Sequence, residues 1–138
     1  MAQEMALTVK KEFKSINFDI IVAVPTTVKS RFKYGFSPVN ELCFALEELL
    51  GVKFSRNILK CRSSKKPQHK STFSERLENV RDKFYCDGRI NGKTVLLVDD
   101  IKTSGATLSA CARKLKFAGA EKVYCVTALA GLAQKKKR

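Results

Sequence analysis

The sequence is short of acidic residues and has none of the long apolar runs that mark membrane proteins. Only 13 aspartates and glutamates accompany 27 lysines and arginines. The net charge of +14 favours an anionic partner, such as a phosphorylated small molecule, nucleic acid or a membrane surface. No apolar stretch approaches the roughly 18 residues of a membrane span, and charges interrupt the amino-terminal MAQEMALTVKKEFKS, so no signal peptide is predicted. We therefore expect a soluble, cytoplasmic protein.

The cysteines lack the close pairing of a metal-binding or disulfide-rich protein. There are five, widely spaced, and no CxxC pair occurs. This pattern excludes a disulfide framework and a zinc knuckle, so no zinc is expected. Cys43, Cys111 and Cys125 fall on apolar faces, where we expect them to be buried as small apolar residues.

Two common phosphate-binding motifs are also missing. The chain contains neither GxxxxGK[ST] nor GxGxxG, which excludes a P-loop and a dinucleotide-binding fingerprint. A length of 138 residues with 44% hydrophobic residues predicts one domain over residues 1–138. Within it we expect an amino-terminal lead-in helix in 1–17, a mobile basic loop over 60–71 and a basic tail over 131–138.

The hydrophobic pattern alternates between strands and helices. FDIIVAVP (18–25) and TVLLV (94–98) have the continuous apolar character of strands that are buried on both faces. A helix is predicted from Ser37 to Gly51, and a short one begins at Thr72 with Phe84 on its apolar side. From Thr107 the apolar spacing is helical, and VYCVTALA (123–130) is another buried strand. Residues 95–130 therefore form a βαβ unit, which requires a parallel sheet.

The stretch VLLVDDIKTSGAT (95–107) carries the clearest chemical signal. Ligands of open α/β sheets bind beyond the carboxyl ends of the strands, where Asp99 and Asp100 are expected. The following turn leads into a helix amino terminus, which attracts anions, and it offers the hydroxyls of Thr103, Ser104 and Thr107. Gly105 allows a close approach of the backbone. The acids can accept hydrogen bonds from sugar hydroxyls while the turn holds a phosphate, so the stretch predicts a sugar-phosphate site.

A purely structural role for the two acids is the alternative. Asp99 and Asp100 would then cap the helix or line a solvated loop. A helix cap needs one acid, whereas this stretch has two acids and three hydroxyls. The sugar-phosphate interpretation therefore accounts for more of the residues.

VLLVDDIKTSGATL resembles the phosphoribosyl pyrophosphate signature of type I phosphoribosyltransferases. The segments VPTTVKSRFKYGFSPVNELCFALEELLG and PQHKSTFSERLENVRDKF narrow the resemblance to the ComF/GntX-like branch, which includes competence-related proteins. The resemblance extends from about Asp19 to Ala130. It implies an α/β fold with an open, mainly parallel sheet flanked by helices and a reduced hood, because only the first 17 and last eight residues are available for that hood.

The resemblance also assigns residues to a substrate. It implies that Asp99 and Asp100 hold the ribose hydroxyls, as candidate catalytic residues, and that Val24, Pro25, Thr26 and Thr27 form a pyrophosphate loop. Magnesium would arrive with phosphoribosyl pyrophosphate, with Asp99 and Asp100 as its possible protein contacts and no dedicated protein site. The implied phosphoribosyl pyrophosphate-binding residues are Asp99, Asp100, Lys102, Thr103, Ser104, Gly105, Ala106 and Thr107. Basic residues that could face the pyrophosphate or close over it are Lys29, Arg31, Lys33, Lys65, Lys66 and Lys70.

The implied reaction is transfer of a phosphoribosyl group with release of pyrophosphate. The acceptor is not specified by the sequence, although Thr103 stands where purine salvage enzymes of this fold place an acid, which argues against that activity. Two non-catalytic alternatives remain. One is a sensor of phosphoribosyl pyrophosphate, and the other is a nucleic-acid-binding protein in which Phe32, Tyr34 and Phe36 stack on bases near basic residues. A homodimer is possible in each case.

Overall fold

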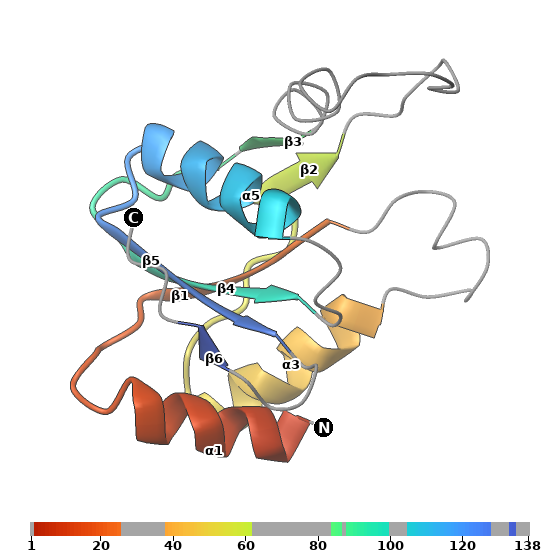
Figure 1. The fold of residues 1–138 in the computed structure, drawn as a ribbon, viewed down its shortest axis with the longest axis vertical. Coiled ribbons are helices and arrows are strands. Elements are labelled where there is room, and N and C mark those ends of the chain that lie inside the picture. Colours follow the sequence, from red (N-terminus) through yellow and green to blue (C-terminus); the bar gives the residue numbers. More distant parts are fainter. Residues whose placement is uncertain are drawn as a thin grey trace.

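A four-stranded sheet runs through the middle of the protein, in the order β1-β4-β5-β6 (Figure 1). The computed structural model describes residues 2–25, 38–61, 84–86, 88–99, 105–127 and 133–134. The sheet consists of β1 (Ile20–Ala23), β4 (Thr94–Asp99), β5 (Lys122–Thr127) and β6 (Ala133–Gln134). β1, β4 and β5 are parallel, and β6 is antiparallel to β5. The predicted open, mainly parallel sheet is confirmed.

Side chains along each strand point alternately to the two faces of the sheet, and this divides the core into two layers. In β4, Val95 and Leu97 pack on one side of the sheet, whereas Leu96 and Val98 pack on the other. Successive side chains of a strand point to opposite faces, so an apolar run such as TVLLV buries both faces. The continuous apolar character of the strands therefore requires helices on both sides of the sheet.

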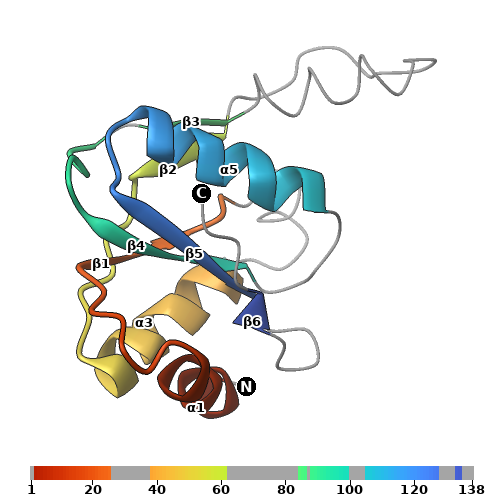
Figure 2. The same cartoon turned by 60° about the vertical axis from the view of Figure 1, so that its left-hand side comes forward.

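Helices from different parts of the chain cover the two faces. α1 (Ala2–Glu12) and α3 (Pro38–Leu50) pack on one face, and α5 (Gly105–Phe117) packs on the other (Figure 2). A small antiparallel pair, β2 (Leu59–Cys61) with β3 (Phe84–Cys86), joins the α5 layer. Within the described ranges, no helix combines the length and the apolar character needed to cross a bilayer.

The βαβ prediction is confirmed. β4, α5 and β5 follow one another, and β4 pairs in parallel with β5 from Thr94↔Lys122 to Asp99↔Thr127. α5 begins at Gly105, two residues before the predicted Thr107, and it ends near Gly119, whose φ is +110°. Cys43, Cys111 and Cys125 are buried, as predicted.

Three local predictions were wrong. Lys60 and Cys61, assigned to the basic loop over 60–71, belong to β2, and the rest of that loop lies outside the described residues. Phe84, assigned to a helix, begins β3 and pairs with Cys61. Ala133 and Gln134, assigned to the basic tail, form β6. These strands have three, three and two residues, too few to produce a hydrophobic period in the sequence.

The amino-terminal helix is confirmed and is part of the core. The side chains of Met5, Ala6, Val9 and Phe13 are buried with residues of α3, β4 and β5. α1 thus covers a face of the sheet, as α3 does (Figure 1). The first 17 residues are part of the material available for the reduced hood, and the helix described among them packs on the face of the sheet that α3 also covers.

Candidate functional site

The carboxyl edge of the sheet brings together segments that are far apart in the sequence. Asp99 ends β4, with Thr127 of β5 as its partner in register on one side. On the other side, the amide of Val24 donates a hydrogen bond to the carbonyl oxygen of Val98, at 2.9 Å. Neighbouring strands lie about 4.8 Å apart, so Val24, Asp99 and Thr127 form one short row across the edge.

Asp99 lies between the two helical layers of the protein. Its side chain is half-buried, and its charge acts on a buried thiol on each side of the sheet. Burial, with a smaller effect of the Asp99 charge, raises the pKa of Cys43 on α3 to about 12. The same two causes raise the pKa of Cys111 on α5. Both thiols therefore stay protonated near neutral pH, which excludes them as nucleophiles at this edge.

The amino terminus of α5 faces the same edge. The helix starts at Gly105, six residues after Asp99, and runs for 13 residues to Phe117. Its first turn contains Thr107, which is half-buried, and contains no acidic residue. The unpaired amides of this turn and the positive end of the helix dipole favour an anion beyond the ends of the strands.

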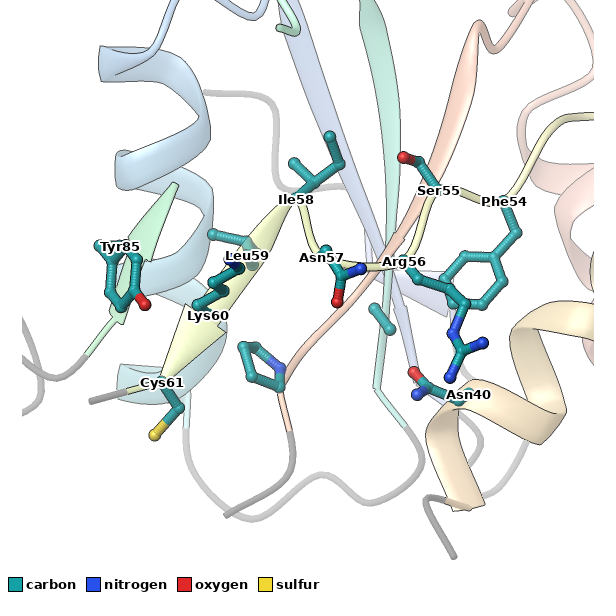
Figure 3. A pocket seen from close by; sticks show the side chains of 12 residues that line it. Asn40, Phe54, Ser55, Arg56, Asn57, Ile58, Leu59, Lys60, Cys61 and Tyr85 are labelled. Carbon is teal, nitrogen blue, oxygen red and sulfur yellow. The ribbon is translucent and has the colours of Figure 1, made fainter. Parts of the chain in front are cut away.

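A cavity of about 280 Å³ opens next to this edge (Figure 3). Pro25, the residue after Val24, contributes to its wall, together with the loop Phe54–Ile58 and the β2/β3 pair. Arg56 and Lys60 supply two positive charges, and no aspartate or glutamate is among its described lining residues. The remaining polar groups come from Asn40, Ser55, Asn57 and Tyr85.

The loop that carries Arg56 is held by contacts to α3. The Arg56 guanidinium lies 5.6 Å from the centre of the Phe44 ring, and it projects toward α3 in Figure 3. Phe44 also meets Phe54 edge to face, with ring centres 5.0 Å apart. Asn57 has a φ of +68°, in the left-handed region that asparagine tolerates better than most residues. This turn directs the polar end of the loop toward the cavity.

The structure describes part of the predicted site and brings that part together. Val24, Pro25, Asp99 and the start of α5 with Gly105, Ala106 and Thr107 all lie at or next to the carboxyl edge. The other predicted site residues lie outside the described residues: Thr26, Thr27, Lys29, Arg31, Lys33, Lys65, Lys66, Lys70, Asp100, Lys102, Thr103 and Ser104.

The cavity residues were missed by the sequence analysis. Asn40, Arg56, Lys60 and Tyr85 come from four separate elements and belong to no motif. A local signal did exist in SRN (55–57), a polar turn between the apolar positions Phe54 and Ile58. That signal predicts a turn, but only the tertiary fold places the turn beside Pro25.

Comparison with known proteins identifies the family. A profile of the phosphoribosyl transferase domain matches residues 45–138, which is more than half of the chain. The chain belongs to the phosphoribosyltransferase family. Its sequence is 30% identical over 111 residues to the DNA utilization protein YhgH of Salmonella typhi, covering 78% of this chain and 48% of that protein. The predicted resemblance to the ComF/GntX-like branch of type I phosphoribosyltransferases is confirmed.

Solved structures of phosphoribosyltransferases have the same fold. The allosteric regulatory enzyme of purine biosynthesis superposes with a TM-score of 0.61 at 20% identity, over 92% of this chain and 25% of that one. The purine phosphoribosyltransferase from Pyrococcus horikoshii superposes with a TM-score of 0.57 at 15% identity, over 91% of this chain and 71% of that one. The phosphoribosyltransferase described here spans about half the length of the YhgH relative that it matches.

Proposed function

We propose that this domain binds phosphoribosyl pyrophosphate with magnesium and transfers the phosphoribosyl group to an acceptor, releasing pyrophosphate. One observation carries the proposal: Asp99, Val24 and the amino terminus of α5 meet at one edge of the sheet. Family membership supports the reaction class. The edge offers a carboxylate for hydroxyl groups and a helix start for a phosphate, and a phosphorylated sugar carries both.

The proposed orientation of the substrate follows from the charges. The 5′-phosphate lies at the start of α5, where the dipole and amides favour an anion. The ribose hydroxyls lie against Asp99 and the neighbouring Asp100. The pyrophosphate then extends past Val24 and Pro25 toward the cavity, where Arg56 and Lys60 are the described cations. Each part of the substrate thus meets groups of complementary charge.

Magnesium fits the donors at this edge. The ion binds carboxylate and phosphate oxygens and keeps several waters, so it needs only one or two carboxylates from the protein. Asp99 is a half-buried carboxylate next to the proposed pyrophosphate position, and Asp100 would be the second. The described residues contain no group of three or more histidine, cysteine, aspartate or glutamate side chains that would hold a metal by itself. When bound, magnesium would neutralise charge on the pyrophosphate.

The chemistry requires charge stabilisation more than a protein nucleophile. The bond between ribose C1 and the pyrophosphate oxygen breaks, the electron pair leaves with pyrophosphate, and a bond forms from C1 to the acceptor. The transition state has oxocarbenium character, as in glycoside cleavage. Asp99 orients the ribose, and the cations of the cavity stabilise the departing negative charge. Orientation of the ribose and stabilisation of the leaving charge are both electrostatic effects, so the reaction needs no cysteine nucleophile. This agrees with the burial and the raised pKa values of Cys43 and Cys111.

Thermal unfolding with and without the substrate tests this proposal. Phosphoribosyl pyrophosphate with magnesium should raise the melting temperature, because a ligand at about 100 times its Kd stabilises a protein by about 2.7 kcal/mol. Asp99→Asn should abolish the shift, whereas Glu121→Gln, an exposed acid at the opposite end of β5, should retain it. An unchanged melting curve for the parent protein with this ligand would refute the proposal.

A panel of acceptors separates an enzyme from a sensor. Pyrophosphate release is measured with phosphoribosyl pyrophosphate, magnesium and a series of bases and amines. Release with one acceptor class, absent in Asp99→Asn, supports transfer. A melting shift without release for any acceptor would favour a protein that only senses phosphoribosyl pyrophosphate.

The relative's name also supports a cellular setting. The relative YhgH, which is 30% identical over 111 residues, is described as a DNA utilization protein, and we propose that the phosphoribosyl chemistry serves DNA uptake in competence. The test replaces the chromosomal gene with the Asp99→Asn allele and measures uptake of labelled DNA. Normal uptake at normal protein level would contradict this link.

A further inference from the structure

The end of the sheet where the strands begin lies opposite the proposed sugar-phosphate site and is strongly basic. In Figure 1 the last turn of α5 and the starts of β4 and β5 lie toward this end, at the left of the view. Exposed or half-exposed cations gather there from α5 and from the starts of β4 and β5: Lys93, Arg113, Lys114, Lys116 and Lys122. The described acids among these segments and the start of β1 are Asp19 and Glu121.

Hydrogen bonds make these segments one continuous surface. The amide of Glu121 donates to the carbonyl of Lys93 at 2.9 Å, and that of Gly92 donates to the carbonyl of Gly119 at 2.8 Å. The carboxylate of Asp19 accepts a hydrogen bond from the amide of Thr94 at 2.8 Å. The loop before β4, the turn after α5 and the start of β1 are therefore held side by side.

Fold stability accounts for only some of these cations. Lysines in the last turn of a helix complement its dipole, and the Nζ of Lys116 donates to the carbonyl of Glu121 at 2.6 Å. Lys93 and Lys122 precede or begin strands, where no helix end requires a positive charge. Their charges are exposed and available to an anionic partner.

Phe117, the last residue of α5, comes two residues before Gly119, whose carbonyl is hydrogen-bonded to the loop before β4. It is 95% exposed, whereas the next most exposed large apolar side chain among the described residues, Leu7, is 67% exposed. Arg113 lies one turn earlier on the same side of α5, and Lys116 is the preceding residue. An aromatic ring bordered by cations offers a stacking face together with charges that bind phosphates.

A second basic feature lies near the end of α1, on the face of the sheet opposite α5. A cavity of about 260 Å³ is lined by residues near the end of α1, including Lys10, Lys14 and Asn17, with Phe13 and Phe18 as aromatic walls. No acidic residue is among its described lining residues. Phe18 immediately precedes Asp19, so this cavity adjoins the start of β1. Phe13 is only 3% exposed and packs against Phe18 and Tyr124, so the lysines, and not the rings, are the groups that this cavity offers to a ligand.

We propose that this basic end, comprising Phe117 and the cations around it, binds single-stranded nucleic acid. Phosphates lie against Lys93, Lys122 and Arg113, and a base stacks on Phe117. Stacking on an exposed ring requires an unpaired base, which selects single strands over duplex. A second copy of this chain is disfavoured as the partner, because two surfaces of the same positive charge would repel. The site is separate from the proposed transferase site.

Binding of a fluorescein-labelled oligonucleotide of about 15 nucleotides, followed by anisotropy, tests the proposal. Phe117→Ala should weaken binding on the order of 5- to 100-fold. Lys93→Gln with Lys122→Gln should weaken it and should make the logarithmic salt dependence shallower by about 1.4. The matched controls are Leu7→Ala on α1 and Arg56→Gln in the cavity at the carboxyl edge. Both should bind as the parent protein does.

Three further measurements can overturn the proposal. Saturating phosphoribosyl pyrophosphate should leave oligonucleotide binding unchanged, and competition would place the oligonucleotide at the carboxyl edge instead. Duplex of the same sequence should bind more weakly. The last measurement is binding to anionic phospholipid vesicles. Vesicle binding that depends on Phe117, without oligonucleotide binding, would identify a membrane surface as the partner. Because the melting shift with phosphoribosyl pyrophosphate is measured separately, failure here leaves the transferase proposal intact.

Discussion

The amide of Val24 donates a hydrogen bond to the carbonyl of Val98 at 2.9 Å. This bond extends the pairing of β1 with β4 by one residue, up to the position where β4 presents Asp99. The chain leaving β1 toward the expected pyrophosphate loop is therefore held beside the acid expected to hold the ribose. Two segments separated by more than 70 positions in sequence thus meet at the edge where the substrate is proposed to bind.

Arg56→Gln should weaken binding of inorganic pyrophosphate with magnesium by about fivefold, because the side chain supplies charge to the cavity while remaining exposed to solvent. Isothermal titration calorimetry measures the change. Arg113→Gln removes the same charge from the other half of the molecule and is expected to leave pyrophosphate binding unaltered. Equal losses of pyrophosphate affinity in both variants would mean that binding depends on the net charge of the protein and not on the position of Arg56.

Cys43→Ala should make the stability of the protein less sensitive to alkaline pH. The pKa of Cys43 is raised from 9.0 to about 12 in the folded state, so between these values the unfolded chain loses a proton that the folded protein retains. Stability from this group is complete below pH 9 and is lost as pH rises toward 12, by at most about 1.4 kcal/mol per pH unit.

Urea unfolding at pH 8, 9 and 10 measures this slope. Val39→Ala, another buried residue of α3, should lower stability by a similar amount at each pH and keep the parent slope. If Cys43→Ala shows the same slope of unfolding free energy against pH as the parent protein, the thiol ionises as readily in the folded protein as in the unfolded chain.

Gly119→Ala should destabilise the protein more than Gly51→Ala does. Both glycines have positive φ, +110° and +69°, a region that costs a side chain about 1–2 kcal/mol. A Cβ at Gly119 would also lie 2.7 Å from Oδ1 and 3.2 Å from Cα of Asn91, whereas one at Gly51 meets nothing within 4 Å. Free energies of unfolding from urea titrations compare the two variants. Equal losses of stability would show that the turn before β4 shifts to accommodate the new methyl group without cost.

Leu97→Ala should lower the free energy of unfolding by about 2–5 kcal/mol, since it leaves a hole in the layer between the sheet and α5. Leu97 is fully buried in the middle of β4. The same substitution at Leu7, which is mostly exposed on α1, should change stability by less than about 0.5 kcal/mol. Calorimetry or urea titration measures both. A small effect at Leu97 would contradict the packing described for this face.

The long elements were predictable because their signals are local. TVLLV predicts a strand buried on both faces, and the helical spacing after Thr107 predicts α5, so their order predicts a parallel βαβ unit. The same order places Asp99 at the carboxyl edge. The short strands were not predictable, since β2 and β3 have three residues each and 22 residues lie between them.

The sequence by itself determined which residues face the core, the parallel βαβ unit and the position of Asp99 at the end of a buried strand. Each of these follows from a periodic pattern within a short window. Only the tertiary structure decided that α1 covers a face of the sheet, that Arg56 and Lys60 share a cavity with Pro25, and that the turn after α5 meets the loop before β4. These relationships join distant segments, and they depend on how whole layers pack against each other, which no local pattern encodes.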